Sequence, residues 1–155
     1  MNIRTDKIAV FVARPSADAA SHEFLQLHRT ADEEIGGTWQ TVRGTIEADE
    51  TAVAAALREL REETALLPRE FYRLGTVETF YDRGSDSIVH SIPFFALIDR
   101  GAKISLNQEH GEIRWVAEHE TDAMFMWPSE KPLLREIRDE LLRESACKGL
   151  LLIRP

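Results

Sequence analysis

The stretch "GTIEADETAVAAALRELREETAL", residues 44–66, combines a glycine, an amphipathic segment and a dense group of glutamates. Its apolar residues recur with the i, i+3, i+4 and i+7 spacing of one helical face, which predicts a helix over residues 50–64. These residues are Val53, Ala56, Leu57 and Leu60. The segment therefore predicts a helix whose apolar face packs on the core and whose carboxylates lie beside that face.

Three of those carboxylates, Glu59, Glu62 and Glu63, fall on one flank of the predicted helix at about 100° per residue. A solvated helix relieves such repulsion with Lys or Arg four residues later, but those positions hold Glu, Leu and Leu. Arg58 and Arg61 offset only part of the charge. A divalent cation removes the repulsion most directly, and oxygen ligands favour Mg²⁺ or Mn²⁺ over zinc. The alternative is an acidic face that is simply solvated.

Composition limits the function classes. With 155 residues and 43% hydrophobic content, the chain can bury one sizeable core, and we expect a single domain over residues 1–155. A net charge of −8 argues against a nucleic acid polymer or an anionic membrane as partner, so an anionic substrate needs a bridging cation. The single cysteine, Cys147, excludes an intrachain disulfide and a Cys-rich zinc site. We expect a cytoplasmic protein without a membrane span, because no apolar run approaches about 20 residues.

The segments around the helix contain mainly strand patterns. Apolar runs and alternating residues predict strands over 8–13, 23–29, 38–47, 74–82, 87–98 and 111–116. Pro93 indicates an edge strand or a bulge. Ser129 is expected to cap a last helix that ends near Gly149, with Leu134, Ile137 and Leu141 on one face, and residues 150–155 to form a short closing strand. The expected fold is α/β, a mixed β-sheet with helices packed on it.

Residues 44–66 resemble the signature of the Nudix hydrolase superfamily, G-x5-E-x7-R-E-U-x-E-E-x-G-U, where U is aliphatic. The matching residues are Gly44, Glu50, Arg58, Glu59, Leu60, Glu62, Glu63 and Leu66. Ala65 stands where the family has glycine, and it would be strained if its φ were positive. The resemblance implies the Nudix fold, a mixed sheet sandwiched between helices (an α/β/α sandwich), with the signature forming a loop, helix and loop.

The same resemblance implies a hydrolase that binds Mg²⁺ or Mn²⁺ and cleaves a diphosphate linkage in a nucleotide-like substrate. Carried over by position, Glu59, Glu62 and Glu63 are the metal ligands and Gly44 offers backbone to the metal or phosphate. Arg58 then orients a carboxylate through an ion pair, and Glu50 supports the site. In such a site the metal neutralises phosphate charge and activates water.

Two further stretches are similar to the bacterial dihydroneopterin triphosphate pyrophosphatases: "WQTVRGTIEADET", residues 39–51, and "QEHGEIRW", residues 108–115. This similarity would make Glu109 a fourth metal ligand or the base that deprotonates water. Alternatively, Glu109 solvates a turn beside Asn107, and Glu112 or Glu118 takes its role.

The expected reaction is hydrolysis of a nucleoside triphosphate or an analogue, dihydroneopterin triphosphate among them, to a monophosphate and pyrophosphate. Two alternatives stay open. One is hydrolysis of a dinucleotide or a nucleotide-sugar, and the other is a non-catalytic module that senses a nucleotide. The C-terminal helix could supply the face of a homodimer.

Other side chains are candidates for substrate contact. The aromatic candidates for stacking on a ring are Trp39, Phe80 and Tyr81, with Trp115, Phe125 and Trp127 as further possibilities. The candidates for phosphate contact are Arg29, His28 and Arg83. For the aromatic residues the alternative is a place in the core. His90 and His110 are expected to be structural, because no second His or Cys stands at metal-ligand spacing.

Overall fold

The computed structural model describes residues 1–31 and 35–154. The strands are β1 (Asn2–Pro15), β2 (His22–Arg29), β3 (Trp39–Gln40), β4 (Val42–Thr45), β5 (Glu70–Arg73), β6 (Glu78–Asp82), β7 (Ser87–Leu97) and β8 (His110–Ala117). The helices are α1 (Ala52–Thr64), α2 (Thr121–Met124), α3 (Lys131–Glu136) and α4 (Lys148–Leu151), with 3₁₀ turns at Glu118–Glu120 and Pro128–Glu130 and a π-helical turn at Ile137–Leu141. Within the described ranges, every helix is too short or too polar to cross a membrane.

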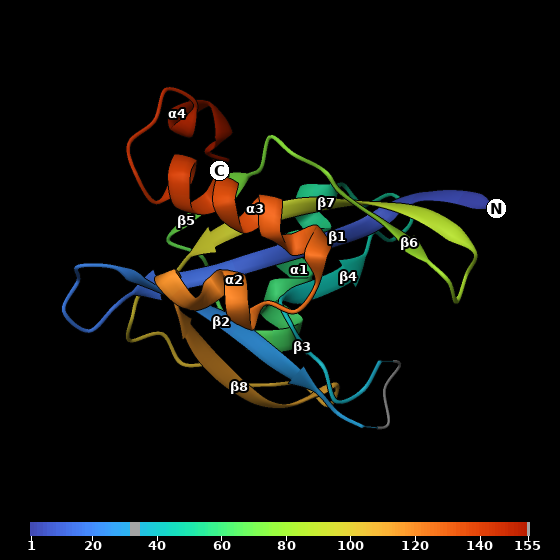
Figure 1. Cartoon of the computed structure of the whole chain (residues 1–155), viewed down its shortest axis with the longest axis horizontal. Helices are drawn as coiled ribbons and strands as arrows, with labels where there is room; N and C mark the ends of the chain where they lie inside the picture. Colours follow the sequence, from blue (N-terminus) through green and yellow to red (C-terminus); the bar gives the residue numbers. More distant parts are fainter. Residues whose placement is uncertain (32–34, 155) are drawn as a thin grey trace.

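The strands form one mixed sheet, and helices cover both of its faces (Figure 1). β1 lies at the centre, parallel to β7 on one side and antiparallel to β2 and β4 on the other. β2 in turn pairs with β8 and β3, and β7 pairs with β5 and β6. The predicted α/β fold with a mixed sheet is confirmed.

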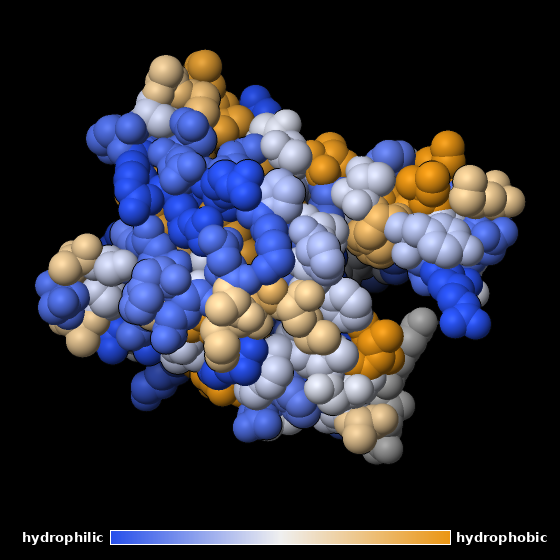
Figure 2. Space-filling model, viewed as in Figure 1, coloured by the Kyte–Doolittle hydropathy of each residue, from blue (hydrophilic) through white to orange (hydrophobic). Residues whose placement is uncertain are grey.

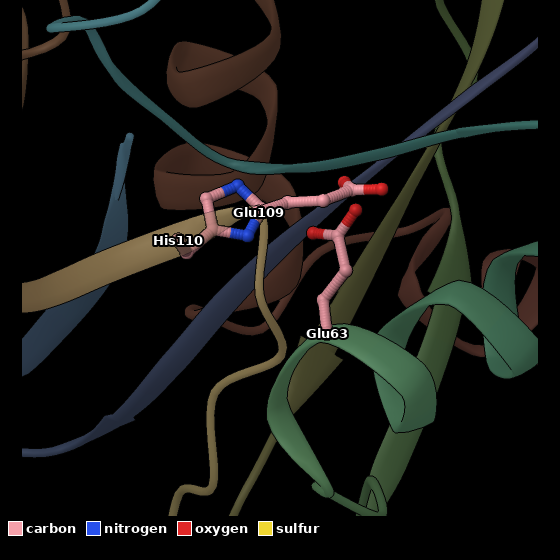
Figure 3. Close-up of side chains that lie close together, drawn as sticks. All are labelled: Glu63, Glu109 and His110. Carbon is pink, nitrogen blue, oxygen red and sulfur yellow. The ribbon is translucent and has the colours of Figure 1, made fainter. Parts of the chain in front are cut away.

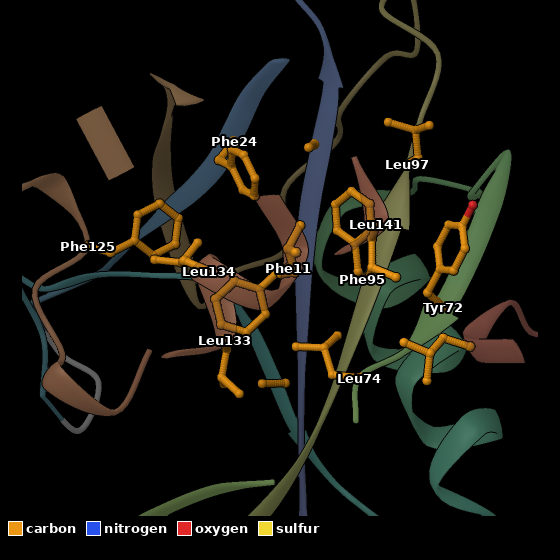
Figure 4. Close-up of a cluster of buried hydrophobic side chains, with 14 of the residues drawn as sticks. Phe11, Phe24, Tyr72, Leu74, Phe95, Leu97, Phe125, Leu133, Leu134 and Leu141 are labelled. Carbon is orange, nitrogen blue, oxygen red and sulfur yellow. The ribbon is translucent and has the colours of Figure 1, made fainter. Parts of the chain in front are cut away.

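The apolar run in β1 is continuous because both faces of the sheet are buried. Successive side chains of a strand point to opposite faces. Ala9, Phe11 and Ala13 therefore enter a cluster that packs against α3 and the π-helical turn, shown in Figure 4. The intervening residues of the stretch 8–13 enter a second cluster, which packs against α1. One strand thus anchors both layers.

Helix α1 begins where Thr51 accepts a hydrogen bond from the N–H of Ala54 through its Oγ1, at 3.1 Å. Its buried residues are Ala55, Ala56, Leu60, Glu63 and Thr64. Leu57, predicted on the apolar face, is instead 37% exposed. The buried face of the helix therefore runs through Ala55, Ala56, Leu60 and Glu63 rather than through Leu57. This arrangement places Glu63 inside the protein.

The exit of α1 adopts the conformation that a glycine would take. Ala65 has φ 61° and ψ 13°, and its N–H donates to the carbonyl of Arg61. A left-handed residue is the common end of a helix, but a Cβ makes it costly. Ala65 therefore adopts a backbone conformation that favours glycine, and it carries the strain.

We expect Ala65→Gly to raise the free energy of unfolding by about 1 kcal/mol, because glycine adopts positive φ without a Cβ penalty. Ala54→Gly is the matched control. Ala54 is exposed inside the same helix, so glycine there should lower stability by about 0.5–1 kcal/mol. Urea unfolding of both variants measures the difference, and equal destabilisation by both would contradict the expectation.

Several strand predictions were wrong in extent. The central strand, predicted over residues 8–13, covers Asn2–Pro15. The predicted strand over residues 38–47 is divided into β3, which pairs with β2, and β4, which pairs with β1. Between them the Thr41 hydroxyl donates to the carbonyl of Val10. β5 was not predicted, because its four residues carry no clear alternation and pair with distant parts of the chain, β7 and Leu152. The strand predicted from Leu74 begins at Glu78.

Pro93 does not mark an edge strand, because β7 is paired on both sides. The pairing of β6 ends at Ser91 and that of β5 begins at Phe94. The carbonyl of Pro93 accepts from the Leu74 N–H at 3.2 Å. Pro93 has no backbone N–H to donate, and it lies between the end of the β6 pairing and the start of the β5 pairing, where no ladder donor is needed. The register shift of the β1–β7 pair lies elsewhere, between Arg4 and Lys7.

The C-terminal helix is shorter than predicted. Ser129 does not cap it, because its hydroxyl donates to Glu78 at 2.8 Å. Leu134, Ile137 and Leu141 are buried together as predicted, but the helix ends after the π-helical turn. Residues 150–151 lie in α4, and the predicted closing strand is reduced to a bridge between Leu152 and Tyr72.

Candidate functional site

Two carboxylates from distant parts of the chain meet at the end of α1. Glu63 lies in the last turn of that helix, and Glu109 directly precedes β8. Figure 3 shows their carboxylates pointing toward one another, with the His110 ring beside them. One potential ligand atom from each of the three residues lies within 4.8 Å of the other two. The fold therefore builds a compact acidic centre.

Glu63 is held in a state that favours a bound positive charge. Only 3% of the residue is exposed, and its Oε2 is buried without a hydrogen-bond partner. Burial, with the charges of Glu59 and Glu109, raises the pKa of Glu63 to about 9, against weaker opposition from Arg29. A buried, uncompensated carboxylate binds either a proton or a cation. The carboxylate oxygens of Glu63 and Glu109 therefore fit a hard divalent cation.

Glu59 packs against the end of β4, the strand that precedes α1. Its side chain is 16% exposed, and burial raises the pKa of Glu59 although Arg58 lies beside it. A Cβ on Gly44 would overlap the Glu59 carboxylate. Gly37 is the one glycine with positive φ among the described residues, so Gly44 is needed for close approach rather than for an unusual φ.

Arg58 connects most of the other carboxylates in this region. It bonds both oxygens of Glu50 at 2.9 Å, Glu59 at 2.8 Å and Glu62 at 3.3 Å. Its guanidinium lowers the pKa of Glu50 to about 2. The arginine thus relieves part of the repulsion for which the sequence suggested a metal, but it makes no contact with Glu63 among those described.

Glu62 is separated from the acidic centre. Its side chain is 57% exposed and does not line the adjoining cavity, although it belongs to the predicted ligand set. The structure brings together Glu59, Glu63, Glu109 and Gly44 around one cavity of about 360 Å³. The predicted metal ligands therefore divide into an inner group and one outer residue.

Basic residues line the same cavity as these carboxylates. They are Arg4, Lys7, Arg29 and Arg43, and all four also line a wider adjoining cavity of about 740 Å³. Figure 2 shows the surface hollowed between the projecting ends of β1, β6 and β7 and the lobe that carries β3. A polyanion that enters this hollow would meet both these cations and the carboxylates.

These cations are not equally available. Arg4 forms a fork with Asp6, at 3.1 and 2.8 Å, and Arg43 is bound to Glu78 and Glu130. Lys7 instead donates to the Thr45 hydroxyl at 2.7 Å and pairs with no carboxylate in the described part of the chain. The sequence patterns gave no sign of Lys7, because its role depends on the cavity.

The wider cavity has aromatic walls. Phe80 and Tyr81, both predicted to contact a ring, line it together with Trp127. Trp39 does not, because its ring packs against His28 and Arg114. The ring centroids of Trp39 and His28 lie 4.8 Å apart, and the Arg114 guanidinium carbon lies 4.3 Å from the Trp39 centroid. Its neighbour Gln40 lines the cavity instead, as strand alternation requires.

The remaining candidates lie away from the centre. Arg14 stacks on Trp115 at 3.7 Å, and Phe125 is part of the core. Of the alternatives to Glu109, Glu112 faces His28 at 3.7 Å, and Glu118 bonds Ser21 and Arg143. His28, Arg83 and His90 are not among the residues that line either cavity.

His110 is 4% exposed, and a buried ring is what we expect of a structural histidine. Burial, with the charge of Arg29, lowers the pKa of His110 to about 4, so its ring is neutral near pH 7. Both ring nitrogens have hydrogen-bond partners, Asn107 and Gln40.

Comparison with known proteins places these features in a family. The model of the NUDIX domain matches residues 5–137. A Mycobacterium tuberculosis protein provisionally named 8-oxo-dGTP diphosphatase 3 is 32% identical over 116 residues, which cover 74% of this chain and 52% of that protein. The chain thus spans about half the length of this curated relative.

Solved structures show the same architecture. The E. coli dihydroneopterin triphosphate pyrophosphohydrolase matches with a TM-score of 0.68 and 19% identity, covering 87% of this chain and 97% of that one. A C. elegans Ap4A hydrolase matches with a TM-score of 0.70 and 18% identity, covering 86% and 95%. At these identities the likeness shows the fold alone, and it does not separate the two named substrates.

Proposed function

This chain belongs to the Nudix family, and from that premise we propose that it is a metal-dependent pyrophosphohydrolase of a nucleoside triphosphate or a close analogue. One observation carries the proposal. The carboxylates of Glu59, Glu63 and Glu109 line one cavity together with Lys7 and other cations, and those cations also line the adjoining cavity that contains Phe80. A triphosphate with a flat ring fits this lining, because its phosphates suit the charged residues and its ring suits the aromatic ones.

The metal proposed is Mg²⁺ or Mn²⁺. Glu59, Glu63 and Glu109 would hold it, with backbone at Gly44 beside them, and their all-oxygen donors suit these hard cations. When bound, the metal supplies positive charge to the phosphate oxygens and acidifies water for attack on phosphorus. The buried, unpartnered Oε2 of Glu63 supports this assignment.

The protein side chains would position the substrate and move a proton. Lys7 and Arg29 would bind phosphate oxygens, while Phe80, Tyr81 and Trp127 would hold the ring. Glu109 lies opposite α1, where it could ligate the metal or accept a proton from water. Attack of water then breaks one phosphoanhydride bond and yields a monophosphate and pyrophosphate.

Two substrates deserve the first tests. The M. tuberculosis relative is named for 8-oxo-dGTP, and two stretches of this chain resemble enzymes of dihydroneopterin triphosphate. Both compounds carry a triphosphate and a flat bicyclic ring with amino and oxo groups on a pyrimidine. The aromatic-walled cavity suits either ring by stacking.

The test is to incubate the protein and Mg²⁺ with nucleoside triphosphates, 8-oxo-dGTP, dihydroneopterin triphosphate, dinucleotides and nucleotide-sugars, and to identify products by mass. We expect pyrophosphate and a monophosphate from at least one triphosphate. Turnover of dinucleotides or sugars alone would overturn the substrate class. Binding without turnover of any compound would indicate a nucleotide sensor.

We expect Lys7→Ala to raise KM for the preferred triphosphate about tenfold with a smaller change in kcat, because a phosphate contact would be lost. Lys103→Ala is the matched control, since Lys103 is exposed and lines neither cavity. Steady-state kinetics at low and moderate salt measure both variants. Equal kinetics for the two variants would remove Lys7 from the site.

A further inference from the structure

Glu109 lies in a loop, yet its backbone is held on both sides. Its N–H donates to Asn107 Oδ1 at 3.2 Å, and its carbonyl accepts from the Thr30 N–H at 3.0 Å. These two bonds tie the residue to the turn before it and to the end of β2. Without these bonds the loop could move and carry the Glu109 carboxylate away from Glu63.

The next residue, His110, extends this arrangement into the protein interior. Its Nδ1 lies 3.3 Å from Asn107 Oδ1, and its Nε2 lies 3.3 Å from Gln40 Nε2. Asn107 Oδ1 can only accept, so Nδ1 carries the proton, and Nε2 then accepts from the Gln40 amide. Asn107 therefore accepts from both the Glu109 backbone and the His110 ring.

The hydrogen bonds also decide between two roles for the histidine. As a metal ligand, His110 would have to offer a ring nitrogen with a free lone pair. Nδ1 is protonated, and the lone pair of Nε2 is directed at Gln40. Gln40 belongs to β3 and is itself 1% exposed, so the contact joins the loop to the sheet. The ring acts as a buried anchor.

We propose that His110 is a positioning residue that fixes Glu109 opposite Glu63, through hydrogen bonds to Asn107 and Gln40, and that it does not ligate the metal. This inference rests on the proposed function, since it assumes that Glu109 serves the metal site. It adds Asn107 and His110, which line neither cavity and act on the site through hydrogen bonds, with Gln40 as their anchor in the sheet.

The experiment is a double-mutant cycle read by Mn²⁺ binding in electron paramagnetic resonance and, separately, by kcat. The variants are His110→Phe, which keeps a ring and removes both hydrogen bonds, Glu109→Gln, and their combination. We expect His110→Phe alone to weaken Mn²⁺ binding and lower kcat about tenfold or more. In the Glu109→Gln background it should change either quantity less than about twofold, because the residue it positions has already lost its charge.

His110→Asn serves as the conservative variant. Its amide can replace Nδ1–H toward Asn107, so we expect part of the lost Mn²⁺ affinity to return. Unfolding of the metal-free variants provides the control for folding. If His110→Phe does not fold, Asn107→Ala replaces it in the same cycle, because it releases the Glu109 N–H and the His110 ring together.

The outcomes separate the inference from the proposed function. An equal loss of Mn²⁺ affinity from His110→Phe in both backgrounds would make His110 a direct ligand and overturn the inference. No loss in the wild-type background, while Glu109→Gln impairs the enzyme, would overturn it as well. If Glu109→Gln itself leaves Mn²⁺ binding and kcat intact, the role proposed for Glu109 fails and the inference fails with it.

Discussion

Glu63→Gln should lower kcat by about a thousandfold while leaving the protein folded. The substitution keeps the size of the side chain but removes the anionic oxygen that is buried and unpartnered at the acidic centre. Metal affinity and water activation should fall together, because both depend on that charge. Steady-state turnover of the preferred triphosphate at saturating Mg²⁺ measures the effect.

The same variant should be more stable than the wild type when metal is removed. The pKa of Glu63 is raised from 4.5 to about 9 in the folded state, so folded protein keeps a proton that the unfolded chain releases above pH 4.5. Stability from this group is present below pH 4.5 and is lost as pH rises toward 9. Glutamine does not titrate. The difference should therefore grow with pH and reach on the order of 2–3 kcal/mol near pH 7.

Urea unfolding in EDTA at pH 5 and pH 8 checks this second effect. Glu62→Gln is the matched control, because Glu62 lies on the same helix but its side chain is 57% exposed. It should change metal-free stability little at either pH. Normal turnover by Glu63→Gln, or a loss of stability at pH 8, would contradict the assignment of Glu63.

Arg43→Met should lower the free energy of unfolding by about 3–5 kcal/mol. Arg43 donates to both oxygens of Glu78, at 2.8 and 2.9 Å, and to Glu130 at 3.1 Å. The side chains of Glu78 and Glu130 are 0% exposed. Removal of the arginine would leave two buried carboxylates without a counter-charge, and burial already raises the pKa of Glu130 to about 7.

A compensated variant distinguishes charge from packing. Arg43→Met combined with Glu78→Gln and Glu130→Gln should recover much of the lost stability, because no buried charge remains. Arg69→Met is the surface control. Its ion pair with Asp99 is half exposed, so the loss should stay below about 1 kcal/mol. Thermal and urea unfolding measure all three, and a loss of under about 1 kcal/mol for Arg43→Met would contradict a strong buried pair.

The local features of the fold were predictable because they depend on near neighbours. The spacing of apolar residues indicated α1, and the apolar run of residues 8–13 indicated the central strand. β5 escaped notice because its pairing with the distant strand β7 makes it a strand. Trp39 was predicted to contact the substrate because the sequence did not show which face of the sheet its side chain points to. A shift of one residue along a strand moves a side chain to the other face.

The candidate site divides in the same way. By itself the sequence determined the helix with Glu59 and Glu63, the glycine at residue 44 and the family, since these lie within one short stretch. Only the tertiary structure decided that Glu62 stays outside and that Lys7 and Trp127 line the cavities. The physical reason is that a helix or strand follows from residues a few positions apart. A cavity follows instead from how strands pair and twist, which brings residues together from distant parts of the chain.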